Sequence, residues 1–275
     1  MTNKTNRLSN LYLAIMFVLL YLPIAYLIFY SFNAGDRMTD FSGFTLDHYR
    51  DLANDSRLLI YIINTFIVAL MSALLATIIG TLGAIAIFYT RQNRIQNMLL
   101  NLNNVLMVTP DVMIGASFLI LFASLLPIRM GFWTVMLAHT AFSVPIVVLM
   151  VLPRLYELNG SMIVAAQDLG ATYTQILTRV LLPNITPGII SGFFMAFTYS
   201  LDDFAVTFFL TGNGFSTVSV EVYSRARTGI SLEINALSSL MFILAFILVI
   251  AYYYLQVSEE RRRRQRRKRL KGVGR

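Results

Sequence analysis

"SMIVAAQDLGATYTQILTRVLLPNITPGI", residues 161–189, is a segment of mixed polar and apolar residues between two long apolar runs. Its pattern predicts a short helix, a turn and a second helix. Ser161 can cap the first helix, and Gly170 suits the left-handed position that ends it. Thr172 can cap the second helix, which we expect Pro183 to bound. Two such helices can lie on a lipid surface, pack on each other or dock into a groove on a partner, and these residues alone leave all three open.

The composition is that of an integral membrane protein. Of the 275 residues, 57% are hydrophobic and 13% are charged, whereas soluble proteins are about 45–50% apolar and about a quarter charged. The mean hydropathy is +0.66. Cysteine is absent, which excludes disulfides and thiolate metal sites. The two histidines, His48 and His139, lie far apart in the sequence, and we expect structural roles for both, not a metal or catalytic role.

Hydropathy over windows of about 19 residues predicts six membrane spans. They cover approximately residues 11–32, 58–89, 98–126, 132–152, 185–210 and 234–257. The apolar runs are far too long for barrel strands, and backbone groups in lipid must be satisfied internally, so we expect an all-α bundle of six transmembrane helices. The first span has no cleavage site after it and is expected to be retained.

The chain divides into three parts. Residues 1–57 hold the first helix and an external loop, 58–257 a core of five helices with a cytoplasmic loop at about 153–184, and 258–275 a basic tail. With the N-terminus inside, the inner segments carry 16 Lys and Arg and the outer segments six, so the positive-inside rule places both termini in the cytoplasm. We expect the tail to bind anionic lipid headgroups, not nucleic acid.

The stretch "AAQDLGATYTQILTRVLLPNITPGI" resembles the cytoplasmic loop of bacterial ABC importer permeases, whose pattern is E-A-A, three residues, G, about nine residues, then I/V-x-L-P. The matching positions are Ala165, Ala166, Gly170, Val180, Leu182 and Pro183. Position 164 is Val where the family has Glu, which removes an acid that could pair with an ATPase subunit or complete a capping box with Ser161. "GFTLDHYRDL" followed by "NTFIVAL" resembles the start of the family's core domain, so the likeness covers nearly the whole chain.

This resemblance implies a type I, MetI-like importer permease with cytoplasmic coupling helices in a bacterial cytoplasmic membrane. It implies as partners a second homologous permease subunit, two cytosolic ATPase subunits, an external substrate-binding protein and membrane lipid. The matching loop positions would couple to the ATPase. No G-x-x-x-x-G-K-[ST] motif is present, so ATP would be bound by the partner subunit and this chain needs no cofactor. "GIISG", residues 188–192, offers a small-residue face that could contact a partner helix or pack inside this chain, and both remain open.

Two adjacent aspartates, Asp202 and Asp203, lie within the fifth predicted span. A charge at that depth costs at least a few kcal/mol, so such residues are expected to face a cavity or a partner. Neighbours on a continuous helix diverge by about 100°. Such a helix would align Asp203 with Ser200 and Thr207 and would turn Asp202 to another face, with Tyr199 near both acids.

A third acid, Asp111, follows Pro110 in the third predicted span. Proline there can break the helix, and broken helices mark substrate sites in transporters. No Lys or Arg lies at similar depth in the spans, so the carboxylates are either protonated or neutralised by a visiting cation. Acids beside Tyr199 suit an organic ammonium through ion pairing and cation–π contact, and they would repel an anion.

The stretches "FTYSLDDFAVTFFLTG" and "TPDVMIGASFLILF" resemble the spermidine/putrescine ABC importer permeases of the PotC type, with the Asp-Asp pair and the Pro-Asp step at corresponding places. The resemblance implies that Asp111, Ser200, Asp202 and Asp203 line the substrate pathway, and we expect Tyr199 beside them. The alternative role for these residues is hydrogen bonding between helices.

We therefore expect a permease subunit of a polyamine importer that works by alternating access, driven by ATPase partners. One alternative is a permease for another cationic or metal-bound solute. Another is a proton-coupled carrier or small channel that uses the aspartates as a relay. An enzyme is disfavoured because the sequence holds no visible nucleophile–base pair or metal cluster.

Overall fold

The computed structural model describes residues 2–35, 38–212, 214–228, 232–247, 249–250 and 254. These residues are almost entirely helical, and the only β pairing among them is an isolated bridge between Asn33 and Phe44. The chain forms two compact units, one of Met1–Ile60 with Glu221–Arg275 and one of Tyr61–Val220.

The first unit contains α1 (Thr2–Tyr30), α2 (Asp47–Asn54), most of α11 (Val218–Thr228) and the apolar helix Leu232–Ile247. Its loop after α1 is organised by the buried side chain of Asn33. The Asn33 amide donates to the carbonyl of Asp40 at 2.9 Å and accepts from the N–H of Ser42 at 2.9 Å. His48 Nε2 lies 2.9 Å from the Asn33 carbonyl oxygen, so this histidine ties α2 to the loop.

In the same unit, Arg225 contacts three carboxylates. Its guanidinium lies 2.6 Å from Glu221, 3.2 Å from Glu233 and 3.3 Å from Asp55. Burial alone would raise the pKa of Asp55, but two backbone N–H groups at the start of α3 and the Arg225 guanidinium hold that pKa below its ordinary value. These contacts connect α11 to the start of α3 (Ser56–Tyr89).

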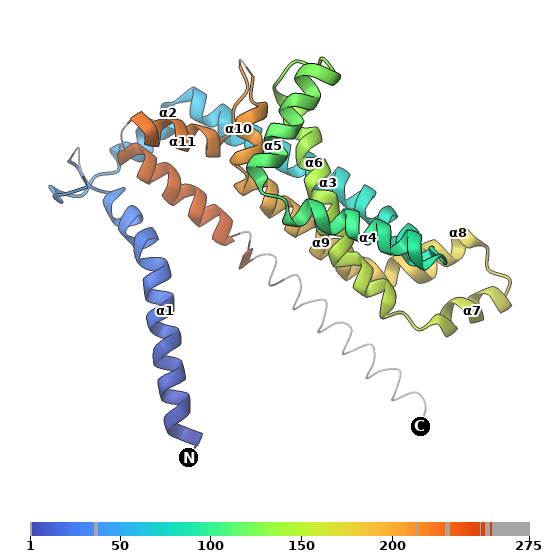
Figure 1. The fold of residues 1–275 in the computed structure, drawn as a ribbon. Helices are drawn as coiled ribbons and strands as arrows, with labels where there is room; N and C mark the ends of the chain where they lie inside the picture. The colour runs from blue at the N-terminus through green and yellow to red at the C-terminus, as the bar shows by residue number, and fades with distance from the viewer. Residues whose placement is uncertain are drawn as a thin grey trace. The chain divides into compact units, whose positions relative to one another are not determined.

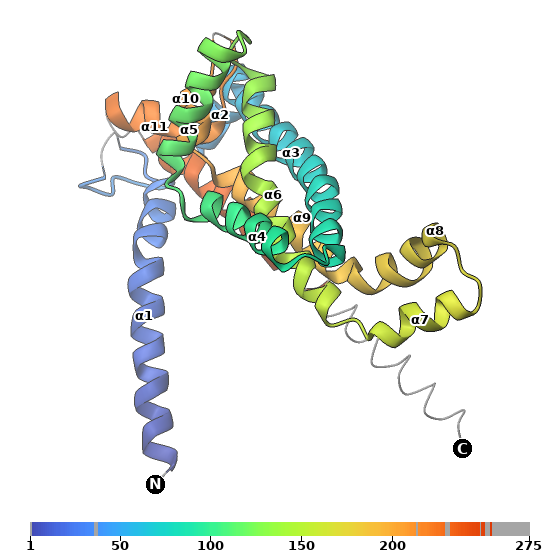
Figure 2. The same cartoon turned by 45° about the vertical axis from the view of Figure 1, so that its right-hand side comes forward.

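The second unit holds the rest of α3 and the helices that follow it. These are α4 (Asn93–Val108), α5 (Asp111–Ile120) with the π-helical segment η1 (Leu121–Leu125), α6 (Phe132–Tyr156), α7 (Gly160–Asp168), α8 (Tyr173–Gln175) with the π-helical segment η2 (Ile176–Leu181), α9 (Leu182–Asp202) and α10 (Ala205–Leu210). In two views, α3, α6 and α9 run side by side and the α7–α8 hairpin projects from one end of them (Figures 1 and 2).

The predicted all-α membrane bundle is confirmed, although the described residues do not reach the full count of six spans. Within the described part of the chain, four helices are long and apolar enough to cross a membrane: Ser9–Tyr30, Ser56–Tyr89, Phe132–Tyr156 and Tyr173–Asp202. The bent pair α4 and α5 is a fifth if it forms one broken span, and Leu232–Ile247 is a shorter apolar helix at the sixth predicted position. Most of 248–257 and all of the tail 258–275 lie outside the described residues.

Close contacts at glycines hold α3, α6 and α9 together. Val147 of α6 is fully buried. A Cβ added to Gly80 of α3 would lie 2.6 Å from the Val147 Cβ, and one added to Gly192 of α9 would lie 3.2 Å from the Val147 Cγ1. One added to Gly188 of α9 would lie 2.8 Å from the carbonyl oxygen of Met150. The small-residue face of residues 188–192 therefore packs inside this chain.

Gly188→Ala should destabilise the second unit, because its methyl group would meet the α6 backbone at 2.8 Å and overpacking of this kind costs about 1–3 kcal/mol. Gly83→Ala is the matched control, since its nearest new contact is the Val148 side chain at 3.7 Å. Thermal unfolding in detergent should give a lower melting temperature for Gly188→Ala than for the control. Equal melting temperatures would contradict this account of the packing.

The segment 161–189 folds into the predicted helix, turn and helix. Gly170 ends the first helix with a φ of +77°, as predicted for a left-handed position. Thr172 caps the second helix, also as predicted. Its hydroxyl accepts from the N–H of Gln175 at 3.4 Å, and the Gln175 side chain accepts from the N–H of Thr172 at 2.8 Å.

Two expectations for this segment are wrong. The cap of α7 is Asn159, whose side chain accepts from the N–H of Ser161 at 3.1 Å, because the helix begins two residues earlier than predicted and Asn caps as well as Ser. Pro183 does not bound the second helix, which continues to Asp202. The preceding turn Ile176–Leu181 is π-helical, so the missing N–H of the proline falls where the regular bonding is already interrupted.

Candidate functional site

Two helices of the second unit are broken. α4 and α5 meet at a bend of 103°, which confirms that Pro110 breaks its helix. α9 and α10 are separated by Asp203 and Phe204, and Asp203 is extended, with φ −64° and ψ 125°. The expectation of one continuous helix through the two aspartates is therefore wrong.

The two short helices beyond these breaks pack closely on each other. A Cβ added to Gly115 of α5 would lie 2.7 Å from the Phe209 ring and 3.1 Å from the Val206 Cα, both of α10. The buried cluster around this contact consists of Val68, Ile114, Phe122, Val135, Ala138, Phe142, Val206 and Leu210. The breaks in α4–α5 and α9–α10 are thus neighbours, held by one apolar core.

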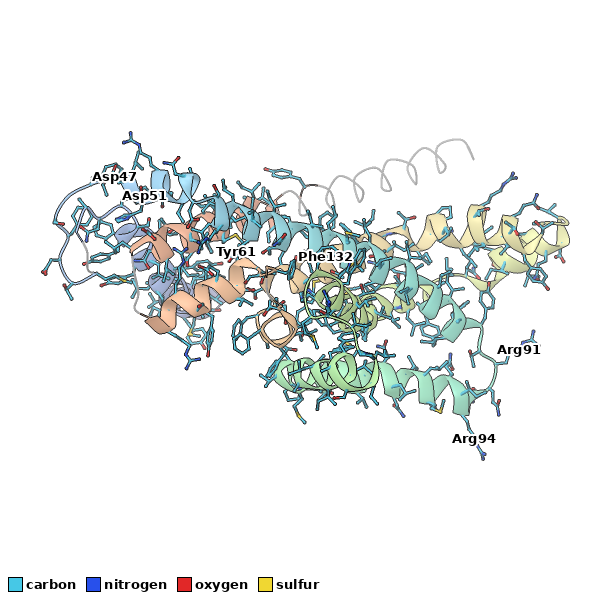
Figure 3. The ribbon with its side chains drawn as sticks, turned by 90° about the horizontal axis from the view of Figure 1, so that it is seen from above. Asp47, Asp51, Tyr61, Arg91, Arg94 and Phe132 are labelled. Carbon is cyan, nitrogen blue, oxygen red and sulfur yellow. The ribbon has the colours of Figure 1, made fainter. Side chains whose placement is uncertain are left out.

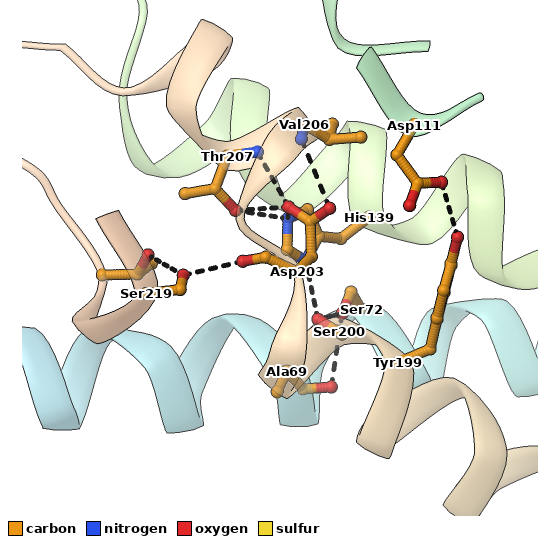
Figure 4. Close-up of polar contacts among 11 residues, drawn as sticks. Ala69, Ser72, Asp111, His139, Tyr199, Ser200, Asp203, Val206, Thr207 and Ser219 are labelled. Carbon is orange, nitrogen blue, oxygen red and sulfur yellow. Dashed lines mark hydrogen bonds and ion pairs between the residues drawn. The ribbon is translucent and has the colours of Figure 1, made fainter. Parts of the chain in front are cut away.

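The carboxylate of Asp203 is buried and hydrogen-bonded at both oxygens (Figure 4). Its side chain is 5% exposed. Oδ1 accepts from the N–H of Val206 at 3.3 Å, and Oδ2 accepts from the N–H and the hydroxyl of Thr207, both at 2.8 Å. The carbonyl oxygen of Asp203 accepts from the Ser219 hydroxyl at 2.7 Å. Asp203 therefore caps the first turn of α10 and supplies the partners that backbone groups need away from water.

His139 of α6 joins both sides of the α9–α10 break (Figure 4). It is 1% exposed. Its Nδ1 lies 2.7 Å from the Ser200 hydroxyl on α9, which in turn lies 3.0 Å from the hydroxyl of Ser72 on α3. Its Nε2 lies 2.9 Å from the Thr207 hydroxyl and 3.3 Å from Asp203 Oδ2. The expectation that the aspartates have no internal partner is wrong for Asp203, because this imidazole provides one.

A second contact links the two breaks. The Tyr199 hydroxyl donates to Asp111 Oδ1 at 2.7 Å, which connects the last turn of α9 to the first turn of α5 (Figure 4). The Tyr199 ring packs edge-on against Phe142 with 5.0 Å between centroids, and Phe142 also contacts the His139 ring at 4.9 Å. Asp111 is exposed and Tyr199 is 39% exposed, so both side chains remain open to a ligand.

Asp202 differs from its neighbour. It is the last residue of α9 and it is exposed. Its carboxylate makes no hydrogen bond or ion pair with any residue in the part of the chain that the structure describes. The C-terminal end of a helix carries a partial negative charge, which adds to the charge of the side chain. Asp202 is thus the acid of the adjacent pair that a cation could approach.

The predicted site residues fall into two groups. Ser200 and Asp203 are drawn together by His139, whereas Asp111, Tyr199 and Asp202 stay accessible. Accessible acids, an aromatic ring and the C-terminal end of a broken helix together favour a cation. Among the described residues, no group of three or more His, Asp and Glu side chains could hold a metal ion.

Two sequence signals could have revealed what was missed. Asp is a preferred capping residue, and Asp203 precedes the apolar run of α10 at the spacing of a cap. His139 is the only histidine within the apolar run 132–152, and a buried polar side chain needs hydrogen-bond partners. These signals indicate a helix start after Asp203 and a hydrogen-bonded histidine on the preceding span, but they do not pair the two residues.

An apolar helical bundle with two neighbouring broken helices is the architecture of a membrane transport protein. The sequence matches the family described as "Binding-protein-dependent transport system inner membrane component" over residues 76–265, and the chain belongs to this family. It is a multi-pass membrane permease of the ABC importer class, and therefore a transport subunit and not an enzyme.

Curated relatives match over most of their length. The spermidine/putrescine transport system permease protein PotC of Haemophilus influenzae is 34% identical over 246 residues, which cover 88% of this chain and 94% of the relative. PotC of Escherichia coli strain K12 is 35% identical, covering 87% and 90%. The putrescine transport system permease protein PotI of the same strain is 36% identical, covering 82% of both chains.

Solved structures share the fold. A chain of a bacterial ABC transporter involved in the import of the acidic polysaccharide alginate matches with a TM-score of 0.75 and 16% identity, covering 93% of this chain and 96% of that chain. A chain of the inward-facing MetNI methionine ABC transporter matches with a TM-score of 0.62 and 18% identity, covering 73% and 95%. At these identities the likeness is one of fold alone.

The two aspartates should differ in their effect on stability. Asp203→Ala removes the cap of α10 and leaves His139 without its carboxylate, and loss of a cap alone costs about 0.5–2 kcal/mol. Asp202→Ala removes an exposed side chain, for which changes usually stay within about 0.5 kcal/mol. Thermal unfolding in detergent should show a clearly lower melting temperature for Asp203→Ala and an almost unchanged one for Asp202→Ala. An equal decrease in melting temperature for both variants would contradict the different environments of the two acids.

Proposed function

We propose that this chain forms one side of the membrane pathway of a polyamine importer, with Asp111, Tyr199 and Asp202 as the residues that meet the substrate. The observation that carries the proposal is the pair of exposed acids at two neighbouring helix breaks, one of them hydrogen-bonded to an exposed tyrosine at 2.7 Å. Substrate sites of transporters are commonly built at such discontinuous helices.

Charge selects the substrate class. The six predicted spans contain no Lys or Arg, so the exposed acids have no fixed counter-charge there. An alkyl ammonium satisfies them by ion pairing, and its methylene chain can lie along the ring of Tyr199. An anion would be repelled by the same acids and by the C-terminal end of α9.

The names of the relatives narrow the class to polyamines. Relatives that are 34% to 36% identical over most of their length are named for spermidine and putrescine transport. A linear polycation has two or more ammonium groups and can pair with Asp111 and Asp202 in turn as it moves. The substrate we propose is therefore spermidine or putrescine.

The hairpin of α7 and α8 is the proposed docking element for an ATPase subunit. Leu169 is 88% exposed and Tyr173 is 86% exposed, and Val164 is 55% exposed, so the tip presents apolar side chains that nothing in the described chain covers. An apolar tip that inserts into a groove would dock by shape, without the acid that other family members have at position 164. The family positions on this hairpin are Ala165, Ala166, Gly170, Val180, Leu182 and Pro183.

We propose that the end carrying this hairpin faces the cytoplasm. Arg91 lies exposed in the α3–α4 connection and Arg94 lies exposed in the first turn of α4, at the same end of the second unit (Figure 3). A hydrogen bond of 3.0 Å from Gln96 to the Tyr156 hydroxyl ties this connection to the end of α6. Basic residues gathered at one end favour the cytoplasmic side. Both termini would be cytoplasmic, with a second permease, two ATPases and an external binding protein completing the transporter.

Asp111→Asn and Asp202→Asn should each raise the KM for spermidine uptake by at least about tenfold, because a desolvated ammonium would lose a counter-charge and such losses commonly cost 2 kcal/mol or more. Tyr199→Phe should have a smaller effect, since the ring remains. Uptake of labelled spermidine and putrescine would be measured in cells that express the complete transporter at matched membrane levels.

The matched control is Asp51→Asn, which removes an exposed carboxylate of α2 (Figure 3) and should leave KM unchanged. If the transporter takes up another organic or metal cation but neither spermidine nor putrescine, the proposed substrate is wrong. Near-normal KM values for both Asn variants would overturn the pathway assignment.

Gly170→Val should uncouple the transporter, because φ of +77° is strained for any β-branched residue. Gly160→Val is the control in the same hairpin, where no atom lies within 4 Å of an added Cβ and φ is ordinary. The readouts are co-purification of the ATPase subunit with a tagged chain and spermidine uptake. Normal co-purification and uptake for Gly170→Val would rule out the docking role.

A further inference from the structure

We propose that His139 is a positioning residue that reserves Asp203 for the helix break, so that of the two adjacent aspartates only Asp202 meets the substrate. This inference rests on the proposed function for the identity of the substrate. It differs from the expectation drawn from the sequence, in which both aspartates line the pathway. The reasons lie in the contacts of Asp203, in the reach of the imidazole and in the direction of its hydrogen bonds.

The carboxylate of Asp203 is shielded from ligands, with 5% of its side chain exposed, and both of its oxygens are already hydrogen-bonded within the protein. Both carboxylate oxygens accept hydrogen bonds from the first turn of α10, and Oδ2 also lies 3.3 Å from His139 Nε2. A substrate ammonium would have to enter this buried position and compete with donors in the first turn of α10, whose backbone groups are costly to leave unsatisfied away from water. The adjacent Asp202 offers the same charge without that cost.

The bridge made by His139 favours a broken helix. Ser200 and Thr207 are seven residues apart, which corresponds to about 10 Å along a continuous helix. One imidazole with a hydrogen bond at each nitrogen spans less than about 8 Å. The ring bonds both hydroxyls, at 2.7 Å and 2.9 Å, so it stabilises the broken arrangement and not the straight one.

The hydrogen bonds also fix which nitrogen donates. The Thr207 hydroxyl donates its proton to Asp203 Oδ2 at 2.8 Å, so it can only accept from His139. Nε2 is therefore protonated and points its N–H toward Thr207 and Asp203. A side chain with a donor here and a polar group toward Ser200 can replace the imidazole, whereas an apolar side chain of similar size cannot.

The consequence for the pathway concerns Asp202. It is the last helical residue before Asp203, so the extended backbone at Asp203 sets where the exposed carboxylate of Asp202 lies. Without the imidazole, the break loses hydrogen bonds on both of its sides, and the end of α9 that carries Asp202 is no longer held in one position. His139 thus acts on the substrate through Asp202, without touching it.

The absence of cysteine from the chain allows a test that needs no substrate. Asp202→Cys would be combined with His139, His139→Gln or His139→Leu in the assembled transporter in membranes. The rate at which a positively charged methanethiosulfonate modifies this cysteine would be measured by mass spectrometry of this chain. We expect similar rates with His and Gln and a rate that differs by at least about fivefold with Leu, equivalent to roughly 1 kcal/mol. Equal rates in all three backgrounds would overturn the positioning role.

Uptake kinetics provide the second test. His139→Leu should raise the KM for spermidine in the natural background but add almost nothing in an Asp202→Asn background, because residues that act through one another are not additive. His139→Gln should restore KM in the natural background. A merely structural loss would lower the maximal rate equally in both backgrounds, and additive effects on KM would overturn the proposal.

The outcomes separate this inference from the proposed function. If Asp202→Asn leaves KM unchanged while the labelling rates differ as expected, the assignment of Asp202 to the pathway fails and the role of His139 in positioning the break stands. If Asp203→Asn raises KM as much as Asp202→Asn, with the same melting temperature as the natural chain, Asp203 meets the substrate and the inference fails.

Discussion

The hydrogen bonds of one buried imidazole are the interaction on which the site depends. A helix that breaks inside a membrane exposes N–H and C=O groups that water cannot satisfy, so the break persists only where side chains replace the missing bonds. Asp203 supplies acceptors for α10, and His139 holds Asp203 while bonding Ser200 on the other side of the break. The charge of Asp203 is thereby used within the protein, and the charge of Asp202 is left for a ligand.

The unbroken helices provide the support for this arrangement. Val147 of α6 is enclosed by Gly80 of α3 and Gly192 of α9, so the three helices approach as closely as their backbones allow. His139 lies on the same α6, two turns before Val147, and its position relative to α9 is set by that packing. The short helices α5 and α10 pack on each other through Gly115. The close packing of α3, α6 and α9 supports the two broken helices, and the accessible acids lie at the breaks.

Sequence reasoning predicted the features that depend on local chemistry. The hydropathy of the long apolar runs gave the helical class, proline gave the break before Asp111, and the φ requirement at Gly170 gave the turn of the hairpin. It failed where a tertiary contact decides. The break at Asp203 depends on a histidine 64 positions earlier in the chain, and neither hydropathy nor helical spacing indicates that contact. The continuation of the helix through Pro183 depends on the π-helical segment before it, which the residue types alone do not predict.

The most direct test of the central claim is an experimental structure of the assembled transporter with spermidine held in the membrane pathway. Our account predicts an ammonium nitrogen within hydrogen-bonding distance, roughly 3 Å, of the carboxylate of Asp202 or Asp111. In the same structure Asp203 should still accept from Thr207 and lie beside His139. An ammonium bound to Asp203, with its contacts to Thr207 and His139 broken, would contradict the account.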